Sequence, residues 1–204
     1  VEGQESGNSD ALRAIKEGCA AITIKQRYTG EEITTAPLAA LIYGRTAVGE
    51  RVWDITRLID VLIEHFDCFA MDRLVTIGNA GGGTTVFYHA CTDKRAYCAV
   101  PVCSVCAYKD SLAAMDSCYC NYIPKIAEYF DMGDLAGLIA PRKLVIFSGQ
   151  LDHGFLIQGA SECADIAKKL YTHAGCPQNM EFVVGELGHY FVGDKAYREL
   201  NKMI

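Results

Sequence analysis

The chain has 204 residues, of which 50% are hydrophobic and 22% are charged, and its formal net charge is −6. This length fits a single domain that can bury about 70% of the surface exposed by the unfolded chain. The negative charge argues against a nucleic-acid partner and against binding to an anionic membrane, since both require a basic patch. No apolar run is long enough to span a membrane and no leader pattern opens the chain. We therefore expect a cytoplasmic protein, with secretion left open because the chain begins at Val1.

Helical and strand patterns alternate along the chain. In order they predict a helix over 11–18, a strand over 19–26, an amphipathic helix over 50–66, a strand over 73–77, a helix over 84–90, a strand over 96–105, a helix over 135–140, a strand over 143–149, a helix over 160–175, a strand over 180–184 and a helix from 194 to the end. Asp134 is expected to cap the helix over 135–140. Residues 107–131 are irregular. Strands that alternate with helices imply a parallel sheet covered on both faces.

The ten cysteines lie within apolar segments such as 97–103, a distribution typical of reduced, buried thiols. Four of them could be read as zinc ligands: Cys103, Cys106, Cys118 and Cys120. The single residue between the last two is shorter than zinc knuckles use. We therefore expect no bound metal.

A glycine-rich stretch, Gly78-Asn79-Ala80-Gly81-Gly82, joins the strand over 73–77 to the helix over 84–90. It has the form of the nucleophile elbow G-x-S-x-G, in which the central residue sits on a strained turn with its side chain above the sheet. The phosphate-binding and dinucleotide-binding patterns of other glycine-rich turns are not matched. Ala80 stands at the centre and has no nucleophilic atom.

If the stretch is a nucleophile elbow, an acid and then a histidine should follow later strands, because triads on this type of sheet run in the order nucleophile, acid, histidine. Asp152 follows the strand over 143–149, and His189 follows the strand over 180–184. Glu186 is a weaker rival acid because it lies too close to His189 in sequence to be held independently. His153 is expected to point away from the acid beside it.

Other polar and aromatic residues carry less weight in the sequence. Trp53 is expected to pack in the core, and Arg45, Glu50 and Asp54 are expected to be solvated or to cap helices rather than to line a site.

Five further short sequence segments occur together with the elbow, the acid and the histidine: Gly44–Thr46, Gly49–Asp54, Cys120–Pro124, Asp131–Leu135 and Ala140–Arg142. Together they resemble the α/β-hydrolase superfamily, in particular the dienelactone-hydrolase-like and acetylxylan-esterase-like bacterial esterases. The resemblance covers nearly the whole chain from Ala11 onward. It implies one α/β-hydrolase domain over 1–204, a mostly parallel sheet with helices on both faces, and a pocket-lining insertion at about 107–131.

The resemblance also implies roles for single residues. Ala80 would stand at the nucleophile position, Asp152 would be the triad acid, His189 the general base, and Gly81 would offer one oxyanion-hole N–H. The implied activity is hydrolysis of a carboxylic ester with a small acyl group such as acetyl, on a small ester or an acetylated carbohydrate. Such chemistry needs no cofactor.

The chain departs from this family in two respects. Alanine cannot attack a carbonyl, so the serine was either replaced deliberately, which the retained acid, histidine and glycines favour, or lost in a natural binding or scaffold module. A cysteine nucleophile is a weaker alternative, since none of Cys103, Cys106 and Cys118 is expected on a strained turn. We also expect the N-terminal strands of the fold to be absent, including a central strand between 19–26 and the elbow. We expect a second chain, another copy or the N-terminal segment to fill that gap.

Overall fold

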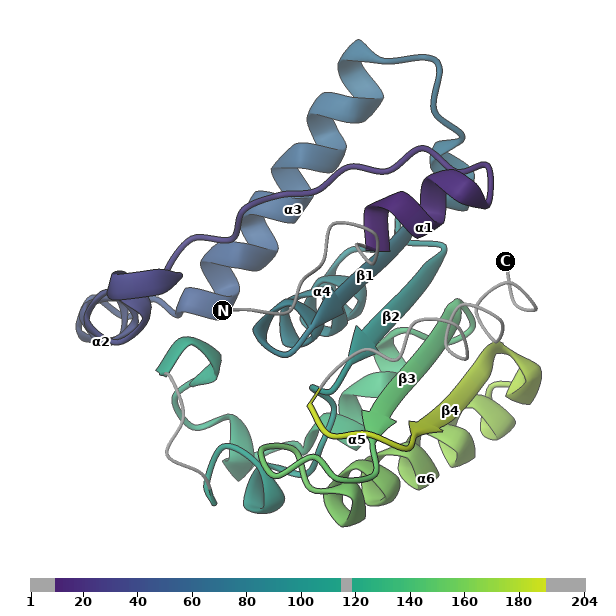
Figure 1. Ribbon diagram of the computed structural model, residues 1–204. Coiled ribbons are helices and arrows are strands. Elements are labelled where there is room, and N and C mark those ends of the chain that lie inside the picture. Colours follow the sequence, from purple (N-terminus) through teal and green to yellow (C-terminus); the bar gives the residue numbers. More distant parts are fainter. Residues whose placement is uncertain (1–9, 115–118, 190–204) are drawn as a thin grey trace.

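The computed structural model describes residues 10–114 and 119–189, which form a layered arrangement of helices against one sheet (Figure 1). Within this part of the chain four strands form a fully parallel sheet in the order β1-β2-β3-β4. The strands are β1 (Val75–Asn79), β2 (Cys98–Val102), β3 (Lys143–Gly149) and β4 (Met180–Gly185). All four were predicted, because each is an apolar run bounded by turn residues.

Six α-helices accompany the sheet in the described ranges: α1 (Asp10–Lys16), α2 (Thr35–Ile42), α3 (Ala47–His65), α4 (Gly81–Thr92), α5 (Met132–Leu135) and α6 (Ile157–His173). The predicted irregular segment is broken into short 3₁₀ turns at Tyr108–Asp110, Tyr119–Asn121 and Ile126–Glu128. Further 3₁₀ turns lie at Gly30–Ile33, Met71–Arg73, Ala136–Leu138 and Pro177–Asn179. None of the described helices is long and apolar enough to cross a membrane. The helix predicted from residue 194 lies outside the described residues.

Alternate residues of β3 belong to two different apolar clusters. Leu144 and Ile146 pack with side chains of α4, α5 and α6, whereas Val145 and Phe147 pack with side chains of β2 and β4 on the opposite face. Successive side chains of a strand point to opposite faces, so both faces of the central strands are buried. This explains why these strands read as continuous apolar runs rather than as an alternating pattern.

The strand predicted over 19–26 is wrong. These residues run as a coil between α1 and α2 (Figure 1) and pair with no strand of the described sheet. A β-branched segment becomes a strand only when a neighbour takes up its backbone hydrogen bonds. The sheet is therefore continuous rather than interrupted, and β1 forms its edge among the described strands.

Two predictions about helices need correction. Trp53 on α3 is 58% exposed and lies beneath the Arg57 guanidinium, so it is not a core residue. Asp134 does not cap its helix; Asp131 does, and the Asp134 carboxylate accepts a hydrogen bond from the Asp131 N–H in a capping box. The helix therefore begins at Met132, earlier than the pattern indicated.

The cysteines are mostly, but not all, buried thiols. Eight described cysteines are free, and Cys19 and Cys68 among them are exposed. Cys120 is disulfide-bonded, which contradicts the prediction of reduced thiols throughout.

Candidate active site

The residue after β1 has the backbone conformation of a strained turn. Ala80 has φ 51° and ψ −121°, a combination that L-residues rarely adopt, and it joins β1 directly to α4. The turn is held by the Ala80 N–H, which donates to the Val102 carbonyl over 2.9 Å, and by the Thr84 N–H, which donates to the Ala80 carbonyl over 2.9 Å. The chain therefore turns sharply from strand to helix at the position of the expected elbow.

Two glycines allow this turn, though not quite the pair that the motif indicated. A Cβ on Gly78 would collide with the carbonyl group of Gly82, and a Cβ on Gly83 would lie 2.7 Å from the Val102 oxygen. A Cβ on Gly82 would meet only the Gln26 side chain, at 3.6 Å, an ordinary contact. The close approach of strand and helix thus depends on Gly78 and Gly83.

Because Ala80 carries the strain, its replacement by glycine tests the turn. We expect Ala80→Gly to raise the free energy of unfolding by about 1 kcal/mol, since relief of the strained φ exceeds the entropy that glycine adds to the unfolded chain. Ala39→Gly, at an exposed position in the interior of α2, is the matched control and should lower that free energy by about 0.5–1 kcal/mol. Urea unfolding measures both. A loss of stability in Ala80→Gly would show that the turn is not strained.

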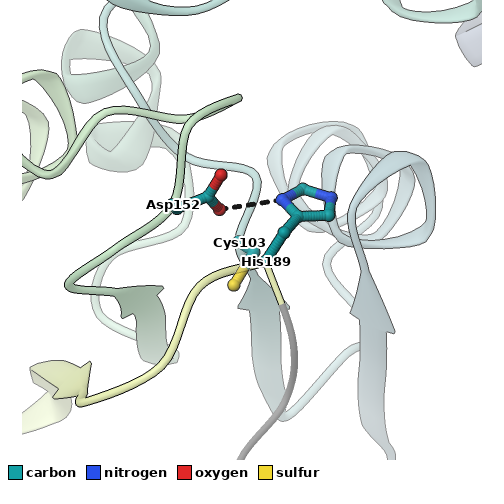
Figure 2. A group of neighbouring side chains, drawn as sticks. All are labelled: Cys103, Asp152 and His189. Carbon is teal, nitrogen blue, oxygen red and sulfur yellow. Dashed lines mark hydrogen bonds and ion pairs between the residues drawn. The ribbon is translucent and has the colours of Figure 1, made fainter. Parts of the chain in front are cut away.

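Asp152 and His189 lie together at the same edge of the sheet (Figure 2). His189 Nδ1 is 2.8 Å from Asp152 Oδ2, and each residue follows a different one of the paired strands β3 and β4. Since the carboxyl ends of parallel strands meet at one edge, the loops after them bring side chains together that are far apart in sequence. The elbow after β1 opens at this same edge (Figure 1).

Asp152 is held rigidly by its surroundings. Its side chain is 1% exposed, and Oδ1 accepts hydrogen bonds from the N–H groups of Gly154 at 2.8 Å and Phe155 at 3.0 Å. Oδ2 is thereby left to face the imidazole. A carboxylate on Nδ1 selects the tautomer whose Nε2 carries a lone pair, which is the form that can accept a proton.

His189 is more open than its partner, with a side chain that is 38% exposed. Its ring stacks on the Phe155 ring, with centroids 5.6 Å apart and planes inclined by 13°. The sequence did not single out Phe155, because a stacking partner three residues beyond the acid has no pattern of its own. Glu186 and His153 are both exposed, and neither forms a hydrogen bond or an ion pair with Asp152 or His189.

Cys103 is the third residue of this group, and the structure corrects one expectation about it. It follows β2 with φ 47°, so a cysteine does sit on a strained turn. Burial, together with the Asp152 carboxylate, raises the pKa of the thiol to about 12. A thiol that stays protonated at neutral pH is a poor nucleophile, so the strained turn does not activate it.

The Cys103 thiol, the Asp152 carboxylate and the His189 imidazole have ligand atoms within 4.8 Å of one another. A metal would need the deprotonated thiol and would have to displace the hydrogen bond between Asp152 and His189. We therefore expect well under one zinc ion per chain in protein purified without chelator, measured by elemental analysis. Stoichiometric zinc that disappears in Cys103→Ser would contradict this.

Two buried polar residues near the elbow were missed by the sequence reasoning. Arg51 on α3 is 3% exposed, and Asn121 is 6% exposed. A Cβ on Gly81 would lie 3.1 Å from Arg51 Nη1 and 3.9 Å from Asn121 Oδ1. Each residue lies in one of the short sequence segments that resemble those of the esterases. Nothing in the sequence alone shows that the two residues meet at Gly81.

Neighbouring charged side chains form ion pairs: Arg45 is solvated as predicted, with a side chain 62% exposed, whereas the Glu50 side chain is only 13% exposed and caps no helix. Glu50 and Asp54 both bind the Arg27 guanidinium, and Glu50 also pairs with Arg45 at 3.2 Å. These groups satisfy one another and leave Arg51 without an acidic partner among the described residues.

With this geometry in place, comparison with known proteins is informative. No family model matches the chain. "Putative hydrolase YtaP" of Bacillus subtilis is 24% identical over 170 residues, which are 80% of this chain and 56% of that protein. A "putative acetyl xylan esterase" from Bacteroides fragilis matches 98% of this chain and 58% of its own, with a TM-score of 0.70 and 16% identity.

The chain has the α/β-hydrolase fold. A further structure of this kind is a serine-to-alanine mutant of the glucuronoyl esterase from Sporotrichum thermophile, with a TM-score of 0.64 and 22% identity over 77% of this chain and 50% of that one. The chain thus spans about half the length of the proteins it matches.

Proposed function

We propose that this chain carries the catalytic half of a carboxylic ester hydrolase that acts by acyl transfer through a Ser-His-Asp triad, and that Ala80 inactivates it at the nucleophile position. The observation that carries the proposal is the Asp152–His189 pair, at 2.8 Å, on the sheet edge where the strained elbow opens. In acyl transfer, an Asp–His pair of this kind activates a hydroxyl nucleophile, which a serine at the elbow would supply.

We propose the following roles for the residues of the site. A serine at position 80 would lose its proton to His189 Nε2 as its oxygen attacks the ester carbonyl, and Asp152 would stabilise the imidazolium that forms. The Gly81 N–H, at the start of α4, would donate to the oxyanion of the tetrahedral intermediate. His189 would then return the proton to the leaving alcohol. Water would repeat the sequence to release the acid.

The substrate we propose is an ester of a carbohydrate with a small acyl group such as acetyl. Two structural matches support the carbohydrate part: one is named as an acetyl xylan esterase, and another holds methyl 4-O-methyl-β-D-glucopyranuronate. We propose that residues 107–131, between β2 and α5, line the pocket for the sugar. This chemistry requires no metal and no organic cofactor.

A second candidate function is a binding module that uses the same pocket without catalysis. The observation in its favour is Ala80 itself, and the glucuronoyl esterase complex is a serine-to-alanine form that still holds its ligand. We also propose that a further strand, from another segment, copy or chain, pairs with the open edge of β1.

The test is the substitution Ala80→Ser, assayed for hydrolysis of 4-nitrophenyl acetate and of acetylated xylan oligosaccharides. Esterase activity in the serine form that far exceeds the residual activity of the alanine form supports the hydrolase. A serine form that is folded and silent, yet binds the oligosaccharide, would favour the binding module.

A further inference from the structure

Arg51 is a buried cation without a counter-ion. It is 3% exposed, and within the described part of the chain no carboxylate pairs with it. Arginine stays protonated in proteins even though burial lowers the pKa of this guanidinium. A charge that is removed from water and left unpaired destabilises the folded chain. Such a residue therefore fits a site that is completed by an anion.

The hydrogen bonds of Arg51 leave one end of the guanidinium unused. Nε donates to the Arg27 carbonyl and Nη2 to the Tyr28 carbonyl, both over 3.0 Å, whereas the described residues offer Nη1 no acceptor. Arg142 provides the contrast, because its two terminal nitrogens donate to the carbonyls of Ala90, Asp93, Ala96 and Leu138. Both terminal nitrogens of Arg142 thus donate to backbone carbonyls, whereas only one terminal nitrogen of Arg51 does.

The unused end of Arg51 faces the start of α4. Nη1 lies 3.1 Å from the point where a Cβ on Gly81 would stand, and Asn121 Oδ1 lies 3.9 Å from the same point. Asn121 is 6% exposed, and its Oδ1 has no hydrogen-bond partner among the described residues. The first N–H groups of a helix also lack intrahelical acceptors and attract negative charge. Two side-chain atoms without a hydrogen-bond acceptor or donor among the described residues, Arg51 Nη1 and Asn121 Oδ1, therefore lie close to Gly81 at the start of α4.

We propose that Arg51, the Gly81 N–H and the Asn121 amide form a binding site for an anionic oxygen at the elbow. Asn121 takes part with its amide turned by 180°, which presents Nδ2 in place of Oδ1. The oxygen can come from two sources. One is a carboxylate of a bound ligand, and the other is the oxyanion of the tetrahedral intermediate. Only the second source rests on the proposed esterase function.

The first arm of the test uses the unaltered chain, with Ala80 in place, and acetate. Acetate is titrated at constant ionic strength while the ¹H–¹⁵N resonance of Gly81 is followed. We expect a saturable shift whose dissociation constant rises at least about tenfold in Arg51→Gln, because the cation that attracts the anion is gone. Arg142→Lys, at the fully used arginine, should leave it within about twofold.

A second pair of variants tests the same site without removing charge. Gly81→Ala puts a methyl group 3.1 Å from Nη1 and should weaken acetate binding at least about tenfold. Gly82→Ala, one residue further on, meets only Gln26 at 3.6 Å and should not. If acetate leaves the Gly81 resonance unmoved, or binds Arg51→Gln and Gly81→Ala as well as the unaltered chain, the inference is wrong.

The second arm distinguishes the two sources in the Ala80→Ser form. If the oxygen is the oxyanion, Arg51→Gln lowers kcat by about 10²–10³ with KM changed less than about threefold. If it is a carboxylate of the substrate, the same variant raises KM for acidic esters and spares neutral ones. An unchanged kcat and KM would refute the site in a working esterase. A silent Ala80→Ser form refutes the proposed function alone, and the acetate titration then decides the inference.

Discussion

Ala80→Ser should raise the rate of acetyl-ester hydrolysis by at least about three orders of magnitude over the alanine form. Loss of a triad nucleophile removes about 10⁶ in kcat, and a residual acceleration of about 10³–10⁴ over water comes from the oxyanion hole and from binding. The rate increase approaches about 10⁶ only if the serine oxygen can hydrogen-bond to His189 Nε2 without movement of the loop after β4.

The control for this gain is His189→Ala in the serine background. Because serine and histidine act as one unit, the double variant should fall back nearly to the rate of the alanine form. Initial rates with 4-nitrophenyl acetate, at matched circular dichroism spectra, measure the effect. A serine form that is folded like its parent and no faster would end the esterase proposal.

Asp152→Asn in the serine background should lower kcat by about 10⁴, while the fold is retained. Asparagine is isosteric, so its Oδ1 can still accept from the N–H groups of Gly154 and Phe155. Its Nδ2 would then face His189 Nδ1 and donate to it. The histidine is driven to the tautomer that carries its proton on Nε2, and that nitrogen can no longer accept the serine proton.

The matched control is Asp93→Asn, the same change at the far end of α4. Asp93 pairs with Arg95, which lowers the pKa of the carboxyl to about 2, and it has no part in the site. Asp93→Asn should reduce stability and leave kcat within about twofold. A kcat in Asp152→Asn within tenfold of the serine form would mean that Asp152 does not set the tautomer.

The parts of the fold that the sequence predicts are those that depend on local pattern. Strand β3 was predicted over its full length, Lys143–Gly149, because it is an apolar run closed by glycine, and the order of chain segments led from it to Asp152 and His189. The strand over 19–26 failed because strand character depends on a partner that local sequence does not contain. Trp53 failed because an exposed aromatic residue and a buried one look alike in sequence.

In the candidate site, too, the residues that sequence patterns predict differ from those that depend on tertiary packing. Ala80 was located by its glycines, and the pairing of Asp152 with His189 followed from the rule of chain order. Arg51 and Asn121 could not be predicted, because they meet at Gly81 only through the packing of α3 and a 3₁₀ turn against α4. The strained turn at Cys103 was missed because nothing at that position resembles an elbow.

The two backbone N–H groups that bind Asp152 have a consequence for how such a chain changes over evolutionary time. Replacing Asp152 by a residue without an acceptor would leave the N–H groups of Gly154 and Phe155 unpaired in a buried place, at a cost of about 1–3 kcal/mol each. Selection for folding alone therefore preserves the acid, even in a lineage that has stopped hydrolysing esters. The His189 side chain is more than a third exposed and, among the described residues, forms no hydrogen bond with the backbone, so folding constrains it less than Asp152. Among homologues that carry alanine at the elbow, we expect the histidine to vary well before the aspartate, so that only a retained histidine indicates recent catalysis.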